Sequence, residues 1–215
     1  MPFDPLILDL CRAFRAAGGR GFLVGGAVRD RQLGLLAKDQ DLEVYGLDAE
    51  RLQALLGQFG QVHLVGQQFA VLHLSTQRGN AEISLPRAES KTGPGHRGFT
   101  VTADPWMDFK DACRRRDFTV NAMLEDPLTG ELLDPFDGLV DLQRGLLRHV
   151  SSAFAEDPLR VLRAARFAAR FDWRIHPQTA ALCRTLNLSE LPRERVAGEW
   201  QYILAAPYPG TGLLA

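Results

Sequence analysis

Residues 21–45 read GFLVGGAVRDRQLGLLAKDQDLEVY, and this stretch decides the fold of the first part of the chain. It predicts a short buried strand over 21–24 that runs into Gly25-Gly26, then a helix over 27–36 and a second strand over 41–45. Paired glycines between a strand and a helix let backbone N–H groups approach a phosphate, and Arg29, one turn into the helix, can reach the same anion. Alone this signal is weak, because such a turn is more often simply a tight turn.

Two carboxylates, Asp39 and Asp41, follow that helix directly. Residues two apart at the start of a strand project to the same side, so these two groups share one small space. Left bare they would repel, and one would be forced to protonate. Mg²⁺ resolves the conflict, because it bridges carboxylates and substrate phosphates. Solvated acids at a strand edge would explain an isolated pair, but the glycines one helix upstream favour metal ligation.

The remaining pattern predicts an α/β part to about His149, followed by an all-helical part. Further helices are expected over 5–17 and over 48–57, where Asp48 is a plausible N-cap. Strands are expected over 62–65, 69–74 and 80–85, and a long loop over 86–105, which is rich in Gly, Pro and Thr. Helices are predicted from there on over 117–124, 139–143, 157–171, 177–186 and from about 192.

The bulk composition excludes some classes of protein. The 215 residues carry 25 basic and 26 acidic side chains, so a strongly basic coat is excluded, yet residues 151–195 hold eight arginines against five acids. A local cationic excess suits a phosphate-bearing partner. Three scattered cysteines predict reduced thiols in a cytoplasmic protein. No run reaches the length of a membrane span, and the acidic N-terminus argues against a signal peptide.

A second motif is Arg114-Arg115-Arg116-Asp117, at the start of a predicted helix. Three consecutive arginines are costly unless an anion or an acid meets them. The simplest alternative is that Asp117 caps the helix while Arg114 and Arg115 stay in water. Arg116 adjoins that cap, and we predict that it is the arginine held at the site.

A third motif lies on the helix predicted over 157–171. Four arginines fall within about a third of its circumference, and Val161, Leu162, Ala165 and Ala169 occupy the other side. These arginines are Arg160, Arg163, Arg166 and Arg170. A solvated cationic face is the usual explanation, but the exclusive use of arginine suits bidentate contacts to phosphates and bases.

Together these motifs resemble those of the bacterial tRNA nucleotidyltransferase (CCA-adding enzyme) and poly(A) polymerase family, class II of the polymerase-β-like nucleotidyltransferases. The resemblance runs from about Phe22 to Ala206 and is closer to the CCA-adding group. Six blocks carry it in one order: FLVGGAVRD, KDQDLEV, KTGPGHRGF, RRRDFTVNAM, DPFDGLVDLQRGLLRHV and AFAEDPLRVLRAARFAARF. It implies a nucleotidyltransferase head over 1–149 with an α/β (α+β) fold and a mixed, mainly antiparallel sheet. An all-helical neck over 150–215 would follow.

The resemblance also implies a role for each motif residue. The metal ligands and catalytic carboxylates would be Asp39 and Asp41, with Glu82 as a third carboxylate. Nucleotide contacts in the head would come from Gly26, Arg29 and Arg116, the last also catalytic. In the neck, Asp157 and Arg160 would read the incoming base, and Arg163 and Arg166 would hold its phosphates.

The base-reading role has a physical basis. Cytosine and adenine each present an amino donor beside a ring-nitrogen acceptor, which an Asp acceptor next to an Arg donor matches. Uracil and guanine present a carbonyl beside an N–H, so acceptor meets acceptor and donor meets donor. Each mismatched buried polar group costs about 1–3 kcal/mol. One protein pair can thus select C and A without a nucleic-acid template.

The implied activity is template-independent, Mg²⁺-dependent nucleotidyl transfer from CTP and ATP to the 3′ end of tRNA. Addition of CCA, CC, A or poly(A) all stay open, and the rival from another class is a nucleotide- or RNA-binding fragment without catalysis. Both aspartates favour catalysis. Family members continue into body and tail helices that grip the tRNA acceptor arm, and this sequence stops shortly after the neck. We therefore also expect either a truncated form or a natural short form whose partner chain supplies that function.

Overall fold

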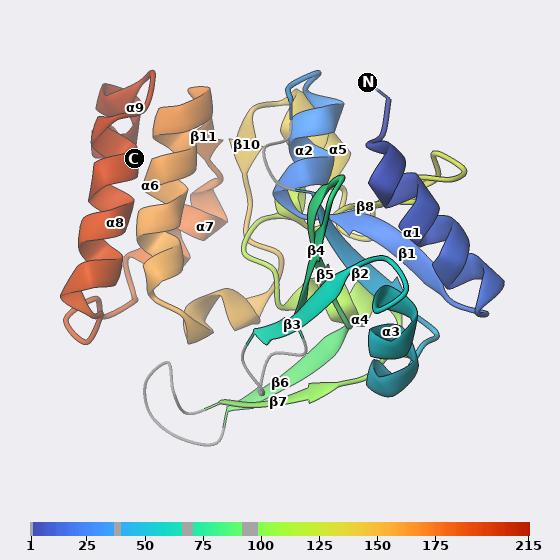
Figure 1. Cartoon of the computed structure of the whole chain (residues 1–215). Helices are drawn as coiled ribbons and strands as arrows, with labels where there is room; N and C mark the ends of the chain where they lie inside the picture. The colour runs from blue at the N-terminus through green and yellow to red at the C-terminus, as the bar shows by residue number, and fades with distance from the viewer. Residues whose placement is uncertain (1, 37–39, 66–70, 92–98) are drawn as a thin grey trace. The chain divides into compact units, whose positions relative to one another are not determined.

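The computed structural model describes residues 2–36, 40–65, 71–91 and 99–215 (Figure 1). The chain divides into two compact units. Unit 1 comprises Met1–Ala112 and Met123–Pro135, and unit 2 comprises Cys113–Ala122 and Phe136–Ala215. Residues 113–122 and 136–149 thus pack with the C-terminal helices, whereas the predicted head extended to residue 149. The assignment of a nucleotidyltransferase head to residues 1–149 and a neck to residues 150–215 stays a prediction.

Unit 1 is built on a seven-stranded sheet in the order β3-β4-β5-β2-β1-β8-β9. Only β2 and β5 run parallel; the other neighbours in this sheet pair antiparallel, which confirms the mixed, mainly antiparallel sheet. The strands are β1 (Arg20–Val24), β2 (Asp41–Tyr45), β3 (Gln61–Val65), β4 (Val71–Thr76), β5 (Gly79–Ser84), β8 (Leu124–Glu125) and β9 (Leu132–Leu133).

Three helices of unit 1 lie close to the predicted ranges, although the helix predicted over 27–36 ends at Gln32. α1 (Pro5–Ala16) contacts β1, α2 (Gly26–Gln32) follows β1 directly, and α3 (Ala49–Leu56) contacts α1 and β3. Asp48 caps α3 as predicted, because its carboxylate accepts the Arg51 N–H at 2.8 Å. α4 (Phe109–Arg114) starts in unit 1, where Phe109 stacks edge-on against Phe22 and Tyr45.

Two local predictions are wrong. Residues 86–105 contain a hairpin, β6 (Arg87–Lys91) paired with β7 (Phe99–Ala103), since the alternating segment FTVTA suits a strand despite the Gly- and Pro-rich stretch before it. The helix predicted over 117–124 is a short 3₁₀ turn, η1 (Thr119–Asn121), followed by β8. Asp117 explains the second error, because its side chain accepts the Phe118 N–H and the Asn121 amide and so competes with a helical ladder.

Unit 2 is mainly helical, as predicted for its C-terminal part. In Figure 1, α6, α8 and α9 lie side by side, and contacts between all three support this arrangement. Phe118 packs edge-on against Phe154 and Phe167 in its core. Unit 2 also contains a parallel two-residue ladder, β10 (Leu146–Leu147) with β11 (Arg174–Ile175), and an isolated antiparallel bridge between Phe118 and His149. The helices are α5 (Gly138–Gln143), η2 (Ser152–Glu156), α6 (Leu159–Phe171), α7 (Pro177–Cys183), α8 (Arg193–Leu204) and α9 (Pro209–Leu214).

Among the described residues, no helix combines the length and the hydropathy needed to cross a bilayer.

The close packing of α1 on β1 requires glycine at position 21, because there is no room for a Cβ there. A Cβ there would lie 2.7 Å from the Phe14 ring and 3.2 Å from the Cys11 sulfur, both buried. We expect Gly21→Ala to destabilise by about 1–3 kcal/mol through overpacking. The matched control is Gly198→Ala inside α8, where a Cβ meets nothing within 4 Å. It should stabilise by about 0.5–1 kcal/mol. Thermal unfolding of both variants checks the opposite signs.

Candidate active site

The Gly-Gly turn and Arg29 lie together in unit 1. Gly25 precedes α2 with φ 67°, a left-handed backbone that favours glycine. A Cβ on Gly26 would lie 3.3 Å from an Arg29 guanidinium nitrogen, so the guanidinium folds back over the turn. Arg29 is only 3% exposed and donates from Nε to the Asp30 carboxylate at 2.8 Å. Its charge is therefore held in place beside Gly26.

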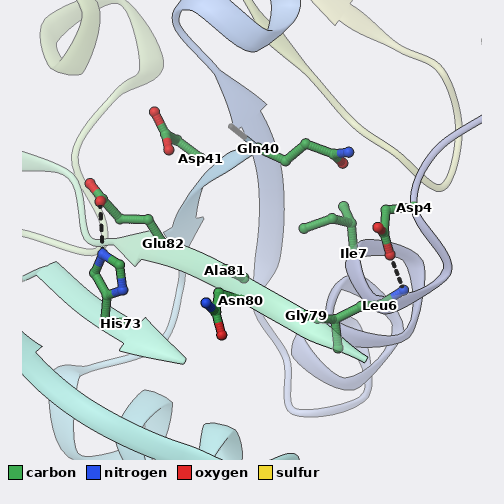
Figure 2. A pocket seen from close by; sticks show the side chains of 10 residues that line it. All are labelled: Asp4, Leu6, Ile7, Gln40, Asp41, His73, Gly79, Asn80, Ala81 and Glu82. Atoms are coloured by element: carbon green, nitrogen blue, oxygen red, sulfur yellow. Dashed lines mark hydrogen bonds and ion pairs between the residues drawn. The ribbon is translucent and has the colours of Figure 1, made fainter. Parts of the chain in front are cut away.

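A row of polar side chains crosses three strands near the start of β2. Asp41 is in register with Glu82 on β5, and Glu82 is in register with His73 on β4, so all three face the same side of the sheet. His73 Nε2 lies 3.3 Å from Glu82 Oε2. Figure 2 shows these side chains at one end of a pocket of about 620 Å³, which Gln40 and Asn80 also line.

The metal prediction stays a prediction, because only part of its ligand set lies in the described residues. Asp41 and Glu82 supply hard oxygen ligands on adjacent strands, about 5 Å apart in a sheet, which suits Mg²⁺. Asp39, the other predicted ligand, lies outside the described residues. Among those that are described, no three His, Cys, Asp or Glu side chains gather closely enough to hold a metal ion. The residues present fit half of a carboxylate site, which Asp39 would complete.

In unit 2, the segment Arg114–Asp117 meets the arginine helix α6. Asp117 is buried, and its Oδ2 accepts from Arg163 Nε at 2.9 Å and from a second Arg163 nitrogen. Burial alone would raise the pKa of Asp117, but the charge of Arg163 and the hydrogen bonds from Asn121, Arg163 and Phe118 hold that pKa below its ordinary value. Asp117 is thus a counterion as well as a turn residue. Arg116, beside it, is partly buried.

Asp157 and Arg160 lie one helical turn apart at the start of α6, joined by a bond from the Arg160 N–H to the Asp157 carbonyl. The Arg160 guanidinium donates to the backbone carbonyls of Ala153 at 2.6 Å and Arg115 at 2.7 Å. These bonds occupy two of its five N–H donors and leave three. The group is therefore anchored on one edge and can still donate on another.

The arginine row on α6 is not the open cationic face that its sequence pattern suggests. Arg166 donates to the Glu199 carboxylate of α8 at 3.1 Å, and its guanidinium carbon lies 5.4 Å from the centre of the Tyr202 ring. The apolar half also differs, since the buried positions are Leu159, Ala164, Phe167, Ala168 and Ala169. Of the four arginines in the row, only Arg170 is exposed.

Sequence comparison decides the family. The family model described as the poly A polymerase head domain matches residues 21–148, more than half of the chain. The chain belongs to this family. The matched range of the poly(A) polymerase head domain includes the Gly-Gly turn, both aspartates and the RRRD motif, and it ends before the arginine helix α6.

Relatives extend the match beyond the head domain. The chain is 47% identical over 193 residues to the multifunctional CCA protein of Nitrosococcus oceani, covering 87% of this chain and 45% of that protein. The Bacillus stearothermophilus CCA-adding enzyme in complex with CTP superposes with a TM-score of 0.82 at 27% identity, over 96% of this chain and 49% of the other. The Thermotoga maritima CCA-adding enzyme complexed with tRNA superposes with a TM-score of 0.79 at 29% identity. This match covers 99% of this chain and 50% of the other. The chain thus spans about half the length of these relatives.

Three residues that form ion pairs with the motif side chains were not identified from the sequence. Asp117 was interpreted as a helix cap, whereas it is the buried counterion of Arg163. Arg195 and Glu199 of α8 pair with Asp157 and Arg166. For Arg195 and Glu199, the available signal was their spacing of four residues, which places opposite charges on one face of α8.

The Asp117–Arg163 pair makes a stability prediction. Asp117→Asn should lower the free energy of unfolding by about 2–3 kcal/mol at pH 7, because it leaves Arg163 without its counterion. That is below the 3–5 kcal/mol of a fully buried pair, since the Arg163 side chain stays 32% exposed. The pKa of Asp117 is lower in the folded protein than the ordinary 3.8. Its contribution is therefore complete above that pH and is lost as the pH falls through the folded value.

Urea unfolding between pH 3 and pH 8, followed by tryptophan fluorescence, checks this prediction. The gap between wild type and Asp117→Asn should stay constant above about pH 5 and narrow below about pH 4. Glu190→Gln, at an exposed position in the same unit, is the control and should show no gap. A gap that widened with acid would contradict an ionised Asp117.

Proposed function

We propose that the protein is a tRNA nucleotidyltransferase of the CCA-adding type, which transfers nucleotides from CTP and ATP to the 3′ end of tRNA. The observation that carries the proposal is the carboxylate row of Asp41 and Glu82 at the pocket in Figure 2, one helix after the Gly-Gly turn and Arg29. Relatives named as CCA proteins, and solved CCA-adding enzymes with CTP and with tRNA, support this choice of substrates.

In this proposal the head residues hold the triphosphate and the metal. Asp39 and Asp41 would hold Mg²⁺, with Glu82 in register with Asp41, and the bound ion would supply Lewis-acid charge for the RNA 3′-hydroxyl and the triphosphate. Arg29 and Arg116 place positive charge near the phosphates, together with the backbone N–H groups after Gly25. Because Arg29 is already fixed by Asp30, little side-chain ordering is needed when the nucleotide binds.

The neck residues choose the base. Asp157 accepts from the amino group of cytosine or adenine, Arg160 donates to the adjacent ring nitrogen, and Arg163 and Arg166 hold the phosphates. The anchored Arg160 supports this role, since its remaining N–H donors point from a fixed group. The reduced cysteines expected from their spacing, and a tRNA substrate, support a cytoplasmic location. The solved relative complexed with tRNA supports tRNA as the substrate, and a partner chain that grips the tRNA acceptor arm also belongs to the proposal.

Poly(A) synthesis is a second candidate, because the matching family model is described by that activity. The two are separated by incubating the chain with tRNA that lacks its three terminal nucleotides, tRNA ending in C and tRNA ending in CC, with each labelled triphosphate in turn. Sequential addition of C, C and A that then stops supports the proposal. Runs of A on every primer support poly(A) synthesis, and no incorporation with retained CTP binding supports a binding fragment.

The metal role is tested on the aspartates. Asp39→Ala and Asp41→Ala should each lower Mg²⁺-dependent incorporation more than about tenfold, the equivalent of roughly 1.4 kcal/mol in the barrier. Each should also remove the strengthening of CTP binding by Mg²⁺ in calorimetry. Glu50→Gln is the control, because this exposed acid on α3 does not line the pocket and its loss should keep the Mg²⁺ effect. A variant that retained more than a tenth of the rate would show that its aspartate is not a ligand.

Base choice is tested on Asp157. Asp157→Ala removes both the repulsion of the uracil carbonyl and the bond to the cytosine amino group. The preference for CTP over UTP should therefore fall by the 1–3 kcal/mol of one mispaired contact, about 5- to 150-fold. Arg163→Ala also removes the counterion of Asp117, so circular dichroism first establishes that this variant folds. It should then weaken all triphosphates alike, because phosphates carry no base identity. The check is kcat/KM for the four triphosphates on one primer RNA, and unchanged ratios in Asp157→Ala would refute base reading by this residue.

A further inference from the structure

Helix α8 carries two charged residues that contact the arginine helix α6, and neither belongs to the motifs above. Arg195 donates to Asp157 Oδ2 at 2.8 Å, with a second nitrogen 3.5 Å from Oδ1. One turn later, Glu199 accepts from Arg166 at 3.1 Å. The two contacts have opposite polarity, and they involve one predicted base-reading residue and one predicted phosphate-holding residue. Helix α8 therefore contacts the proposed base-reading residue Asp157 and the proposed phosphate-holding residue Arg166 through two different side chains.

The Asp157 carboxylate is held from two directions. Its Oδ1 accepts the Leu159 N–H at 3.1 Å, which fixes it to the first turn of α6. Its Oδ2 accepts from Arg195, which lies on a different helix. A carboxylate has about four acceptor sites, so these bonds leave acceptor capacity on Oδ2. The plane of the group is set by Leu159 and Arg195 together, and neither bond alone would fix its rotation.

We propose that Arg195 is a specificity-determining positioning residue, which holds the Asp157 carboxylate in the orientation that accepts the amino group of cytosine or adenine. This inference rests on the proposed function of the neck. Arg195 itself touches neither the base nor the phosphates. It acts by making Asp157 a rigid acceptor, and its effect appears as a ratio between bases.

Rigidity matters because discrimination depends on a penalty as well as on a bond. When uracil is bound, its carbonyl faces the carboxylate, and an Asp157 free to rotate can turn away and relieve the repulsion. When cytosine is bound, the same freedom has to be lost before the bond forms, which weakens binding. The relief of repulsion strengthens the binding of UTP, and the lost freedom weakens the binding of CTP, so both lower the preference for CTP over UTP. Loss of Arg195 should thus reduce discrimination although Asp157 is still present.

A purely structural role for Arg195 predicts a different result. If the ion pair only docks α8 on α6, its loss should weaken all four triphosphates by one common factor. The Glu199–Arg166 pair provides the comparison, because it joins the same two helices at a phosphate-holding residue. Glu199→Gln should change the four affinities together and leave their ratios as they are.

The experiment measures dissociation constants of CTP, ATP, UTP and GTP for the whole chain with Mg²⁺, by calorimetry or fluorescence. In Arg195→Ala the ratio of the UTP constant to the CTP constant should fall about 2- to 12-fold, as expected for one lost hydrogen bond. Arg193→Ala, an exposed change in the first turn of α8, should leave the ratio unchanged. Arg195→Lys should recover part of it. The double variant Asp157→Ala/Arg195→Ala should match Asp157→Ala alone, because Arg195 acts only through Asp157.

Two outcomes would overturn the inference. One is an unchanged ratio, with or without equal weakening of all four nucleotides, and the other is a higher ratio, which would mean that Arg195 competes with the base for Asp157. Circular dichroism first establishes that each variant folds. If Arg195→Ala does not, Arg195→Gln, which keeps a donor but loses the charge and the fork, is measured instead and should still lower the ratio. Failure of the proposed function looks different, since the wild-type chain would then show no preference for CTP and ATP at all.

Discussion

The ion pair between the buried Asp117 and the partly exposed Arg163 is the interaction on which unit 2 depends. A guanidinium on a helix that packs on both sides cannot be left without an anion, and Asp117 supplies one from a segment more than 40 residues earlier in the chain. To do so, the chain has to turn sharply after Arg116, and the Asp117 side chain makes that turn by accepting the Phe118 N–H and the Asn121 amide. One carboxylate therefore both shapes the segment and neutralises the helix.

The need to pair a buried charge also applies to Arg166 and Glu199, which join α6 to α8. Burial lowers the pKa of Arg166, and it raises the pKa of Glu199 against the opposing effect of Arg166 and Arg163, so each group of that pair is costly to ionise alone. Glu199 also keeps one oxygen without a hydrogen-bond partner among the described residues. Such a pair adds little stability compared with an apolar contact of equal size. The pair does fix the orientation of Arg166, the arginine proposed to hold a phosphate.

Much of unit 1 could be predicted from the sequence, because its signals are local. The strand over 41–45 and the cap at Asp48 follow from alternation and capping chemistry within a few residues. The hairpin of β6 and β7 was missed because its glycines and prolines outweighed the alternation of FTVTA. The partners of Asp157, Arg163 and Arg166 could not be predicted either, since periodicity shows which residues share a helix face but not what packs on it. A row of arginines looks the same in sequence whether water or a second helix covers it.

The proposed reading of a base without a template would place a physical demand on the contacts of Asp157 and Arg160. A nucleic-acid template discriminates because stacking holds its donors and acceptors in a plane, whereas side chains on a helix rotate about their χ angles. A protein pair can match that discrimination only if its rotations are removed before the base arrives, so that mismatch cannot be relieved by turning away. Arg160 meets this demand through two backbone carbonyls, and Asp157 meets it through the Leu159 N–H and Arg195. Three of these four contacts arise outside α6, so the proposed selectivity would depend on the segments packed around the helix as much as on its own sequence.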